Sequence, residues 1–278
     1  MTDTETHLEE LASKHYENFP VGSFAMPARF RRPIRLIYSF ARVADDIADE
    51  GNEPAADRIQ RLNIWSDLLH RSLEESTEYA VLNELAVEIQ KRKLPVRLFD
   101  DLMIAFRKDC ENHLYQSYEE VLEYCSYSAN PIGKLLLHIF HCFNEENERF
   151  SDDICTALQL TNFWQDISID TRRNRFYIAR NEFEQFGFSI ADLQRNTRKK
   201  EFVDFMKHKI EWTKGLFESG KPLIRNVPLV FRLELKLIWN GGMRILEKIE
   251  ESGYDTRAFR PVVGRKDKLS IFFKALRT

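Results

Sequence analysis

Apolar residues recur at the spacing of an α-helix through almost the whole chain, and the alternating pattern of a β-strand is nearly absent. The predicted helices cover residues 33–50, 55–75, 78–92, 95–112, 117–127, 129–146 and 151–170, after a weaker helical pattern over 7–17. Two or three more are expected between 199 and 253, with breaks at Gly220-Lys-Pro222 and Asn226-Val-Pro228. This periodicity predicts an all-α fold.

Domain organisation follows from the same pattern. The chain has 278 residues with only 10 Gly and 9 Pro, and it contains no Ser/Gly linker, tandem repeat or low-complexity tract. A helical bundle of this length buries a large core. We therefore expect one domain over residues 1–278, with a compositionally distinct tail over 257–278.

Charge and cysteine usage exclude some classes of function. The net charge of -3 predicts no nucleic-acid partner. The cysteines at 110, 125, 142 and 155 have neither zinc-site nor disulfide-framework spacing, which predicts reduced thiols in a cytoplasmic protein. The first ten residues lack the pattern of a signal peptide, and the longest apolar run, Leu135–Phe143, is too short to cross a bilayer.

An acidic motif lies near the end of the helix predicted over 33–50. On a helical projection Asp45 and Asp49 share a face with Tyr38, Ala41 and Arg42, whereas the opposite arc carries Phe40, Val43, Ala44 and Ile47. This pattern predicts a buried back and an acidic front. Two aspartates four residues apart repel each other, so a cation is expected to face them.

A second acidic motif follows 121 residues later, counted from Asp45 to Asp166. Gln159, Asn162, Asp166 and Asp170 fall within an arc of about 80°, opposite Ala157, Leu160 and Trp164. If the two acidic faces meet across a bundle, they form a divalent-metal site. The alternative is that each is a solvated face balanced by nearby Lys and Arg.

Spacing alone does not decide between these alternatives. With 44 acidic residues, chance supplies about seven acidic pairs at i,i+4. The two motifs differ from such pairs because their helices are unusually apolar and because Tyr38, Gln159 and Asn162 share the acidic arcs. Oxygen ligands without Cys or His favour Mg²⁺.

Mg²⁺ held by carboxylates suits the departure of a diphosphate, because the metal neutralises the charge that develops on the leaving group. The carbocation left behind needs a dry pocket lined by aromatic and apolar side chains. The chain has 21 Phe and 4 Trp, which could supply a central apolar cavity or simply an ordinary core.

These residues carry a family resemblance. Arg42-x-x-Asp45-Asp46-x-x-Asp49 resembles the first aspartate-rich motif of the squalene and phytoene synthases, and Asn162-x-x-x-Asp166-x-x-x-Asp170 followed by Arg175-Phe-Tyr177 resembles the second. The resemblance runs from about residue 15 to about residue 246. It implies an all-α isoprenoid synthase bundle whose aspartates hold Mg²⁺ and an isoprenoid diphosphate.

Four stretches resemble the hydroxysqualene synthase branch of bacterial hopanoid pathways: Tyr16-Glu-Asn-Phe-Pro20, Arg42–Glu50, Ser128–Gly133 and Thr161–Asp166. This resemblance implies conversion of presqualene diphosphate and water to hydroxysqualene and diphosphate. The chain departs from the broader family at Glu17, Ser126, Asn130-Pro131 and Gln165. We expect these departures to disfavour the condensation of two farnesyl diphosphates.

Other candidate residues have a structural reading beside the functional one. His15 is a candidate phosphate ligand or a helix-end histidine, and Tyr38 and Tyr124 either contact diphosphate or a cation or pack in the core. Arg175 is the best candidate for a phosphate clamp after the second motif, whereas Arg172 and Arg173 are expected to be solvated.

The C-terminal tail is basic and aromatic. Residues 257–278 contain seven basic residues and one acidic residue, interleaved with Phe259, Ile271, Phe272, Phe273 and Leu276. The composition of the tail predicts either contact with an anionic membrane surface or packing against the bundle.

Two other functions stay open: a prenyl transferase that makes presqualene diphosphate, squalene or phytoene, and a non-catalytic assembly factor of the same fold.

Overall fold

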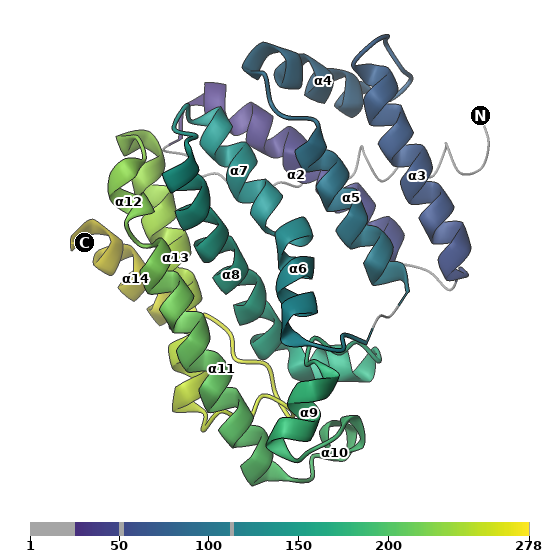
Figure 1. Ribbon diagram of the computed structural model, residues 1–278. Helices are drawn as coiled ribbons and strands as arrows, with labels where there is room; N and C mark the ends of the chain where they lie inside the picture. The colour runs from purple at the N-terminus through teal and green to yellow at the C-terminus, as the bar shows by residue number, and fades with distance from the viewer. Residues whose placement is uncertain (1–25, 50–52, 112–113, 278) are drawn as a thin grey trace. The chain divides into compact units, whose positions relative to one another are not determined.

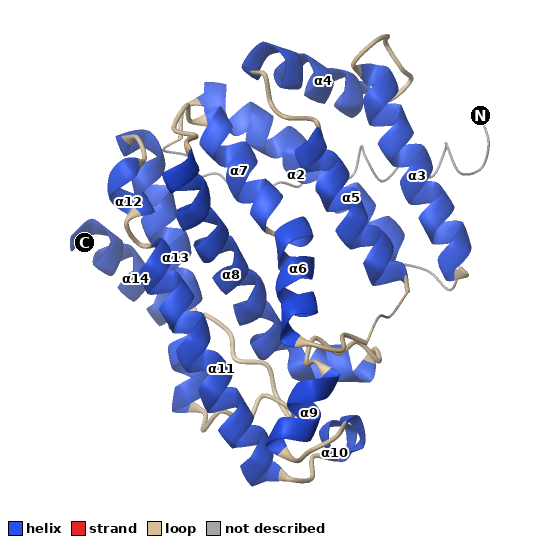
Figure 2. Cartoon of the chain, in the orientation of Figure 1, coloured by secondary structure: helices blue, strands red, loops and turns tan. Residues whose placement is uncertain are grey.

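The computed structural model describes residues 26–49, 53–111 and 114–277. Within these ranges every regular element is a helix (Figure 2). The chain divides into two compact units: the described residues up to Glu111 with Lys134–Phe143, and Asn112–Gly133 with Asn144 onward. The weak helix predicted over 7–17, His15, Glu17 and Tyr16–Pro20 all lie outside the described residues.

Four long helices form most of the first unit: α2 (Ala28–Asp49), α3 (Ala55–Ser72), α4 (Ala80–Arg92) and α5 (Arg97–Cys110) (Figure 1). α2 packs against the other three. Phe40 of α2 lies at the centre of this core, with its ring centroid 5.8 Å from Trp65 and 5.5 Å from Phe99. The Trp65 indole also donates to the Phe40 carbonyl at 3.2 Å, so the back of α2 is fixed by packing and by a hydrogen bond.

Pro33 does not begin its helix as the sequence predicts, because α2 starts five residues earlier, at Ala28. A proline inside a helix leaves the carbonyl four residues before it without its usual donor. That carbonyl is Arg29 O, and Arg92 Nη2 of α4 donates to it at 2.5 Å. A tertiary contact therefore compensates for the missing bond and lets the helix run through the proline.

The second unit contains α6 (Tyr118–Ser128), α8 (Glu145–Arg172), α9 (Arg180–Phe186), α10 (Ile190–Arg195), α11 (Lys199–Gly220), α12 (Leu223–Asn226), α13 (Leu229–Glu251) and α14 (Arg265–Arg277). α7 (Asn130–Ile139) begins in this unit and ends in the other. α8 contacts α6, α10, α11, α12 and α13, and Figure 1 shows it running beside α11. It is the central helix of this unit.

Two contacts hold α8 closely against α11. Gly220 at the end of α11 lies so close to α8 that an added Cβ would come within 2.6 Å of the Phe150 carbonyl oxygen. Trp164 is fully buried, and its indole donates to the Thr213 hydroxyl of α11 at 3.0 Å. Close approach and a buried polar contact therefore hold α8 against α11.

The continuous helix predicted over 129–146 is wrong. α7 ends at Ile139, His141 adopts a left-handed φ of 56°, and α8 begins at Glu145. The Asn144 side chain accepts from the Asn147 N–H at 2.8 Å, which caps α8 at a new start. The sequence also gave no prediction for α9, α10 and α14, because two are short and the third lies in the basic tail.

No helix in the described part of the chain has both the length and the apolarity needed to span a bilayer.

The four cysteines are free; Cys110 and Cys125 are buried, and Cys142 and Cys155 are half-buried. Burial raises the pKa of the Cys125 thiol to about 12 and that of Cys142 to about 11, so both thiols stay protonated near neutral pH.

Candidate active site

The first acidic motif lies on the partly exposed face of α2. Tyr38, Asp45 and Asp49 are half-buried, whereas the opposite arc, Phe40, Val43, Ala44 and Ile47, has no exposed surface. The two faces are therefore those that the sequence predicts. Arg42 supplies positive charge at this motif: its Nη1 lies 2.8 Å from Asp45 Oδ2, and its Nη2 lies 2.8 Å from Asp46 Oδ1.

The second acidic motif lies on α8 with the same division of faces. Gln159, Asp166 and Asp170 are half-buried and Asn162 is exposed, opposite the fully buried Ala157, Leu160 and Trp164. The four polar residues predicted from the sequence thus share one accessible face. The buried indole of Trp164 on the other side keeps that face turned away from the core.

A residue that the sequence analysis missed contacts this motif. Arg260, in the segment between α13 and α14, meets both carboxylate oxygens of Asp166: Nε donates to Oδ1, and Nη2 donates to Oδ2 at 3.3 Å. The hydrogen bond with Asp166 raises the pKa of Arg260 above its ordinary value. Arg260 lies 94 residues from Asp166 in a tail where basic residues are common, so no sequence pattern singles it out.

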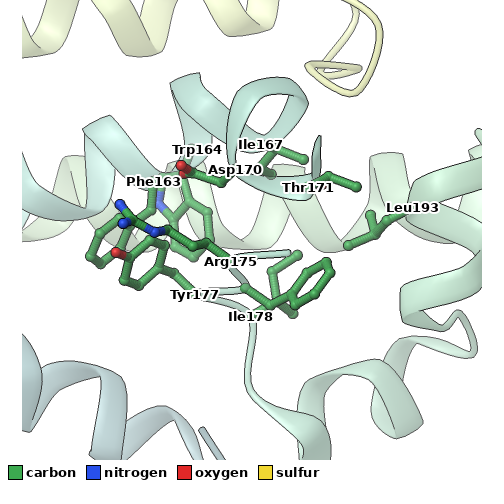
Figure 3. Close-up of a pocket in the computed structure, with 10 residues that line it drawn as sticks. Phe163, Trp164, Ile167, Asp170, Thr171, Arg175, Tyr177, Ile178 and Leu193 are labelled. Atoms are coloured by element: carbon green, nitrogen blue, oxygen red, sulfur yellow. The ribbon is translucent and has the colours of Figure 1, made fainter. Parts of the chain in front are cut away.

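A pocket opens where α8 ends and the following segment turns back. It contains about 260 Å³ of empty space, open solvent included, and its lining includes Phe163, Asp170, Thr171, Arg175, Tyr177 and Leu193 (Figure 3). Figure 3 shows Arg175 and Tyr177 extending toward the side where Phe163 lies. The pocket thus combines one carboxylate and one guanidinium with aromatic walls, but it is too small to enclose a long ligand.

Four aromatic rings form a cluster beside this pocket. The rings of Phe163 and Tyr177 stack nearly parallel with centroids 3.7 Å apart. Tyr124 of α6 is buried, with its ring 6.1 Å from Phe163 and 5.7 Å from Tyr177, and Tyr115 lies 5.9 Å from Tyr124. Aromatic ring faces attract cations. Of these residues only Tyr124 was singled out beforehand, although Tyr177 belongs to the quoted Arg175-Phe-Tyr177 stretch.

A buried ion pair fixes the segment that carries Arg175 and Tyr177. The Glu182 carboxylate accepts from the Ala179 N–H at 3.1 Å and pairs with Lys209 of α11, and both charged side chains are almost fully buried. Lys209 Nζ also lies 3.3 Å from the centroid of the Tyr118 ring. Burial lowers the pKa of Lys209 despite the neighbouring Glu182, and it raises the pKa of the Tyr118 hydroxyl. These contacts anchor the wall of the pocket to α11.

Two positions where the chain departs from the family have structural partners. Gln165 donates to the Pro261 carbonyl at 2.5 Å, and Asn130 Oδ1 accepts from the Thr156 hydroxyl at 3.1 Å. Arg172 and Arg173 are exposed, as the sequence analysis expected, whereas Arg175 is half-buried in the pocket wall.

The donor chemistry of the second motif fits Mg²⁺. Asp166, Asp170 and Asn162 present carboxylate and amide oxygens on one accessible face. The guanidinium of Arg260 already places a positive charge against Asp166 there. Over 26–49, 53–111 and 114–277, no three His, Cys, Asp or Glu side chains are grouped closely enough to hold a metal alone. The motifs belong to different units, so a joint site stays a prediction.

Comparison with known proteins decides the family. The sequence profile described as squalene/phytoene synthase matches residues 12–267, nearly the whole chain. The chain belongs to the squalene/phytoene synthase family. This membership confirms the resemblance drawn from the two aspartate-rich motifs, and it makes an enzyme of isoprenoid synthesis the expected kind of protein.

Individual relatives agree with this assignment. A hydroxysqualene synthase of Rhodopseudomonas palustris is 32% identical over 76% of this chain and 71% of its own length, and one of Sinorhizobium fredii is 30% identical over 84% and 80%. A chloroplastic phytoene synthase of Zea mays is 26% identical over 94% of this chain and 65% of its own length.

Solved structures confirm the fold. The squalene synthase HpnC from Alicyclobacillus acidocaldarius superposes with a TM-score of 0.81 at 33% identity, covering 91% of this chain and 95% of that protein. A dehydrosqualene synthase solved with a ligand gives a TM-score of 0.84 at 19% identity, covering 99% and 97%. The all-α isoprenoid synthase fold predicted from the sequence is therefore correct.

Proposed function

We propose that this protein is a hydroxysqualene synthase that converts presqualene diphosphate and water to hydroxysqualene and diphosphate. The observation that carries the proposal is the accessible polar face of α8, which continues into a pocket with a carboxylate, a guanidinium and aromatic walls. Relatives named hydroxysqualene synthase, at 30% identity and above, support this branch over others.

The proposed metal ligands are Asp45 and Asp49 on α2 and Asn162, Asp166 and Asp170 on α8. Mg²⁺ bound there supplies positive charge that neutralises the departing diphosphate. Arg42, Gln159 and Arg175, with His15 from outside the described residues, are the proposed diphosphate ligands. Arg175 suits this role because its guanidinium lies in the same pocket wall as Asp170.

The chain's own aromatic residues have the second role. Once the carbon–oxygen bond of presqualene diphosphate breaks, the cyclopropylcarbinyl cation needs surroundings that stabilise positive charge and exclude bulk water. The rings of Tyr124, Phe163 and Tyr177 offer such surroundings within one cluster, and Tyr38 is proposed to contact the diphosphate or the cation from α2. After the cation rearranges, a single water molecule adds to it, supplies the hydroxyl group of the product and releases one proton.

The test incubates the purified full chain with Mg²⁺ and presqualene diphosphate, without NADPH, and identifies products by mass spectrometry. We expect hydroxysqualene and inorganic diphosphate, and no turnover when EDTA removes the metal. Turnover that continues in EDTA would contradict the metal mechanism. No product from any prenyl diphosphate would favour the non-catalytic assembly factor.

A second candidate is a head-to-head prenyl transferase, because a phytoene synthase aligns with 94% of the chain at 26% identity. A parallel incubation with farnesyl diphosphate and Mg²⁺ distinguishes it. Presqualene diphosphate or a C30 hydrocarbon formed from farnesyl diphosphate alone would move the protein to that branch. We expect neither product, because Glu17 and Gln165 stand where the sequences that this chain resembles have a lysine and an arginine.

The proposed location of the enzyme is an anionic membrane surface, contacted through α14. This helix packs on α13 through Ile271 and Ala275, while Leu269, Phe272, Phe273 and Leu276 are 42–61% exposed. Its acid, Asp267, turns inward to Arg244 at 2.7 Å and Lys248 at 3.1 Å, which lowers the pKa of Asp267. The outward face is therefore apolar and flanked by the exposed cations Arg265, Lys266 and Lys268.

Co-sedimentation with vesicles tests this contact. We expect the protein to bind phosphatidylglycerol vesicles and not phosphatidylcholine vesicles, and Phe273→Glu to abolish that binding. Val87→Glu is the matched control, because Val87 is equally exposed but lies on α4. Equal binding by wild type and Phe273→Glu, or self-association of the wild type in place of vesicle binding, would contradict the membrane contact.

A further inference from the structure

Arg260 engages the carboxylate that the proposed function assigns to Mg²⁺. Its guanidinium meets both oxygens of Asp166, and the two side chains are 40% and 26% exposed. A planar guanidinium that grips two oxygens in this way matches a carboxylate and a phosphate equally well. Arg260 is therefore suited to change partner between these two kinds of anion.

The backbone on either side of Arg260 is held in place. On one side, the buried side chain of Arg257 binds Asp255 at 2.9 Å and donates to the Thr197 carbonyl at 2.5 Å. On the other side, the Pro261 carbonyl accepts from Gln165 of α8. The guanidinium of Arg260 can thus leave Asp166 by side-chain rotation while its Cα stays beside the motif.

We propose that Arg260 neutralises Asp166 in the metal-free protein and moves to the substrate diphosphate when Mg²⁺ binds that carboxylate. This inference rests on the proposed function, which assigns Asp166 to the metal. Charge balance supports the transfer, because Mg²⁺ on Asp166 repels the guanidinium while the incoming diphosphate attracts it. Arg260 is then a competitor of the metal before substrate binds and a diphosphate ligand afterwards.

The two roles predict opposite effects of one substitution. In Arg260→Gln, we expect Mn²⁺ to bind the substrate-free protein about two- to fivefold more tightly, the effect of losing a half-exposed ion pair. With Mg²⁺ saturating, we expect the affinity for inorganic diphosphate to fall about tenfold, because a charge-assisted hydrogen bond is lost. Electron paramagnetic resonance measures the first affinity and calorimetry the second.

Two further variants control for charge and geometry. Arg225→Gln removes the same charge from an exposed position on α12 and should leave both affinities unchanged. Arg260→Lys keeps the charge without the fork and should give intermediate values for both. A residue that merely stabilised the fold would not move the two affinities in opposite directions.

The outcomes separate this inference from the proposed function. Arg260→Gln that binds Mn²⁺ as the wild type does, or more weakly, overturns the competition, and unchanged diphosphate affinity overturns the transfer. Either result leaves the metal site intact as long as Asp166→Ala weakens Mn²⁺ binding. A wild-type protein that binds no Mn²⁺, or an Asp166→Ala variant that binds it normally, overturns the metal site and the inference together.

Discussion

The two acidic motifs have the same arrangement on their helices but obtain their positive partners in different ways. On α2, Arg42 pairs with Asp45 and Asp46 from one turn earlier on the same helix. On α8, Asp166 pairs with Arg260 from a segment 94 residues further along the chain. The first pairing follows from helical spacing, whereas the second exists only because the tail folds back onto α8.

The difference shows where each motif can respond to a ligand. Asp46 is buried beside Arg42, so moving that arginine takes a positive charge away from a buried carboxylate. Asp166 and Arg260 are both partly exposed, so their separation costs little. Arg42 is therefore suited to stay on Asp46 while it binds diphosphate, whereas Arg260 is suited to exchange partners.

Removing an aspartate from either motif should have the largest effect. We expect Asp45→Ala and Asp166→Ala each to lower kcat/KM about a thousandfold, because each removes charge that holds the metal and the diphosphate. Circular dichroism should not change, since the buried faces of both helices remain. If the motifs act together, the double variant loses little more activity than either single one. Full additivity would indicate two independent sites.

Removing the two arginines should separate the motifs by stability. We expect Arg42→Gln to lower the free energy of unfolding by about 2 kcal/mol, because the Asp46 carboxylate is buried. Arg260→Gln should lower it by less than about 1 kcal/mol, as for other exposed pairs. Urea unfolding measures both. Equal losses would mean that the distant pair is as structural as the local one.

The smallest effect concerns acid. The bond from Arg257 lowers the pKa of Asp255 below its ordinary value of 3.8. A carboxylate with a lowered folded pKa contributes stability that is fully present above pH 3.8 and is lost as the pH falls through the lower, folded value.

The melting temperature of the wild type should therefore decline in that acid window, and the decline should be shallower in Asp255→Asn. The measurement is a thermal melt at a series of pH values, with Asp67→Asn as a control because Asp67 is exposed on α3, outside the segment that carries Arg260. Parallel curves for wild type and Asp255→Asn would remove Asp255 from the anchoring of Arg260.

Features that depend on spacing within one helix could be predicted from the sequence, whereas features that depend on contacts between distant segments could not. The faces of α2 and α8, with Trp164 and Ile47 buried and the aspartates accessible, were predictable because a helix repeats every 3.6 residues. The start of α2 before Pro33 was not, since it depends on Arg92 of another helix. The break between α7 and α8 was missed because the helical pattern continues across it and a single residue, Asn144, caps the new start.

The sequence by itself determined an all-α chain, its two acidic helix faces, the position of Arg42 on the face of Asp45 and the family to which the motifs belong. Only the tertiary structure decided that Arg260 meets Asp166, that Phe163, Tyr124 and Tyr177 form one aromatic cluster, and that α14 turns its acid inward. The physical reason is that helical periodicity orders residues within a few turns, whereas contacts between distant segments depend on how whole helices pack.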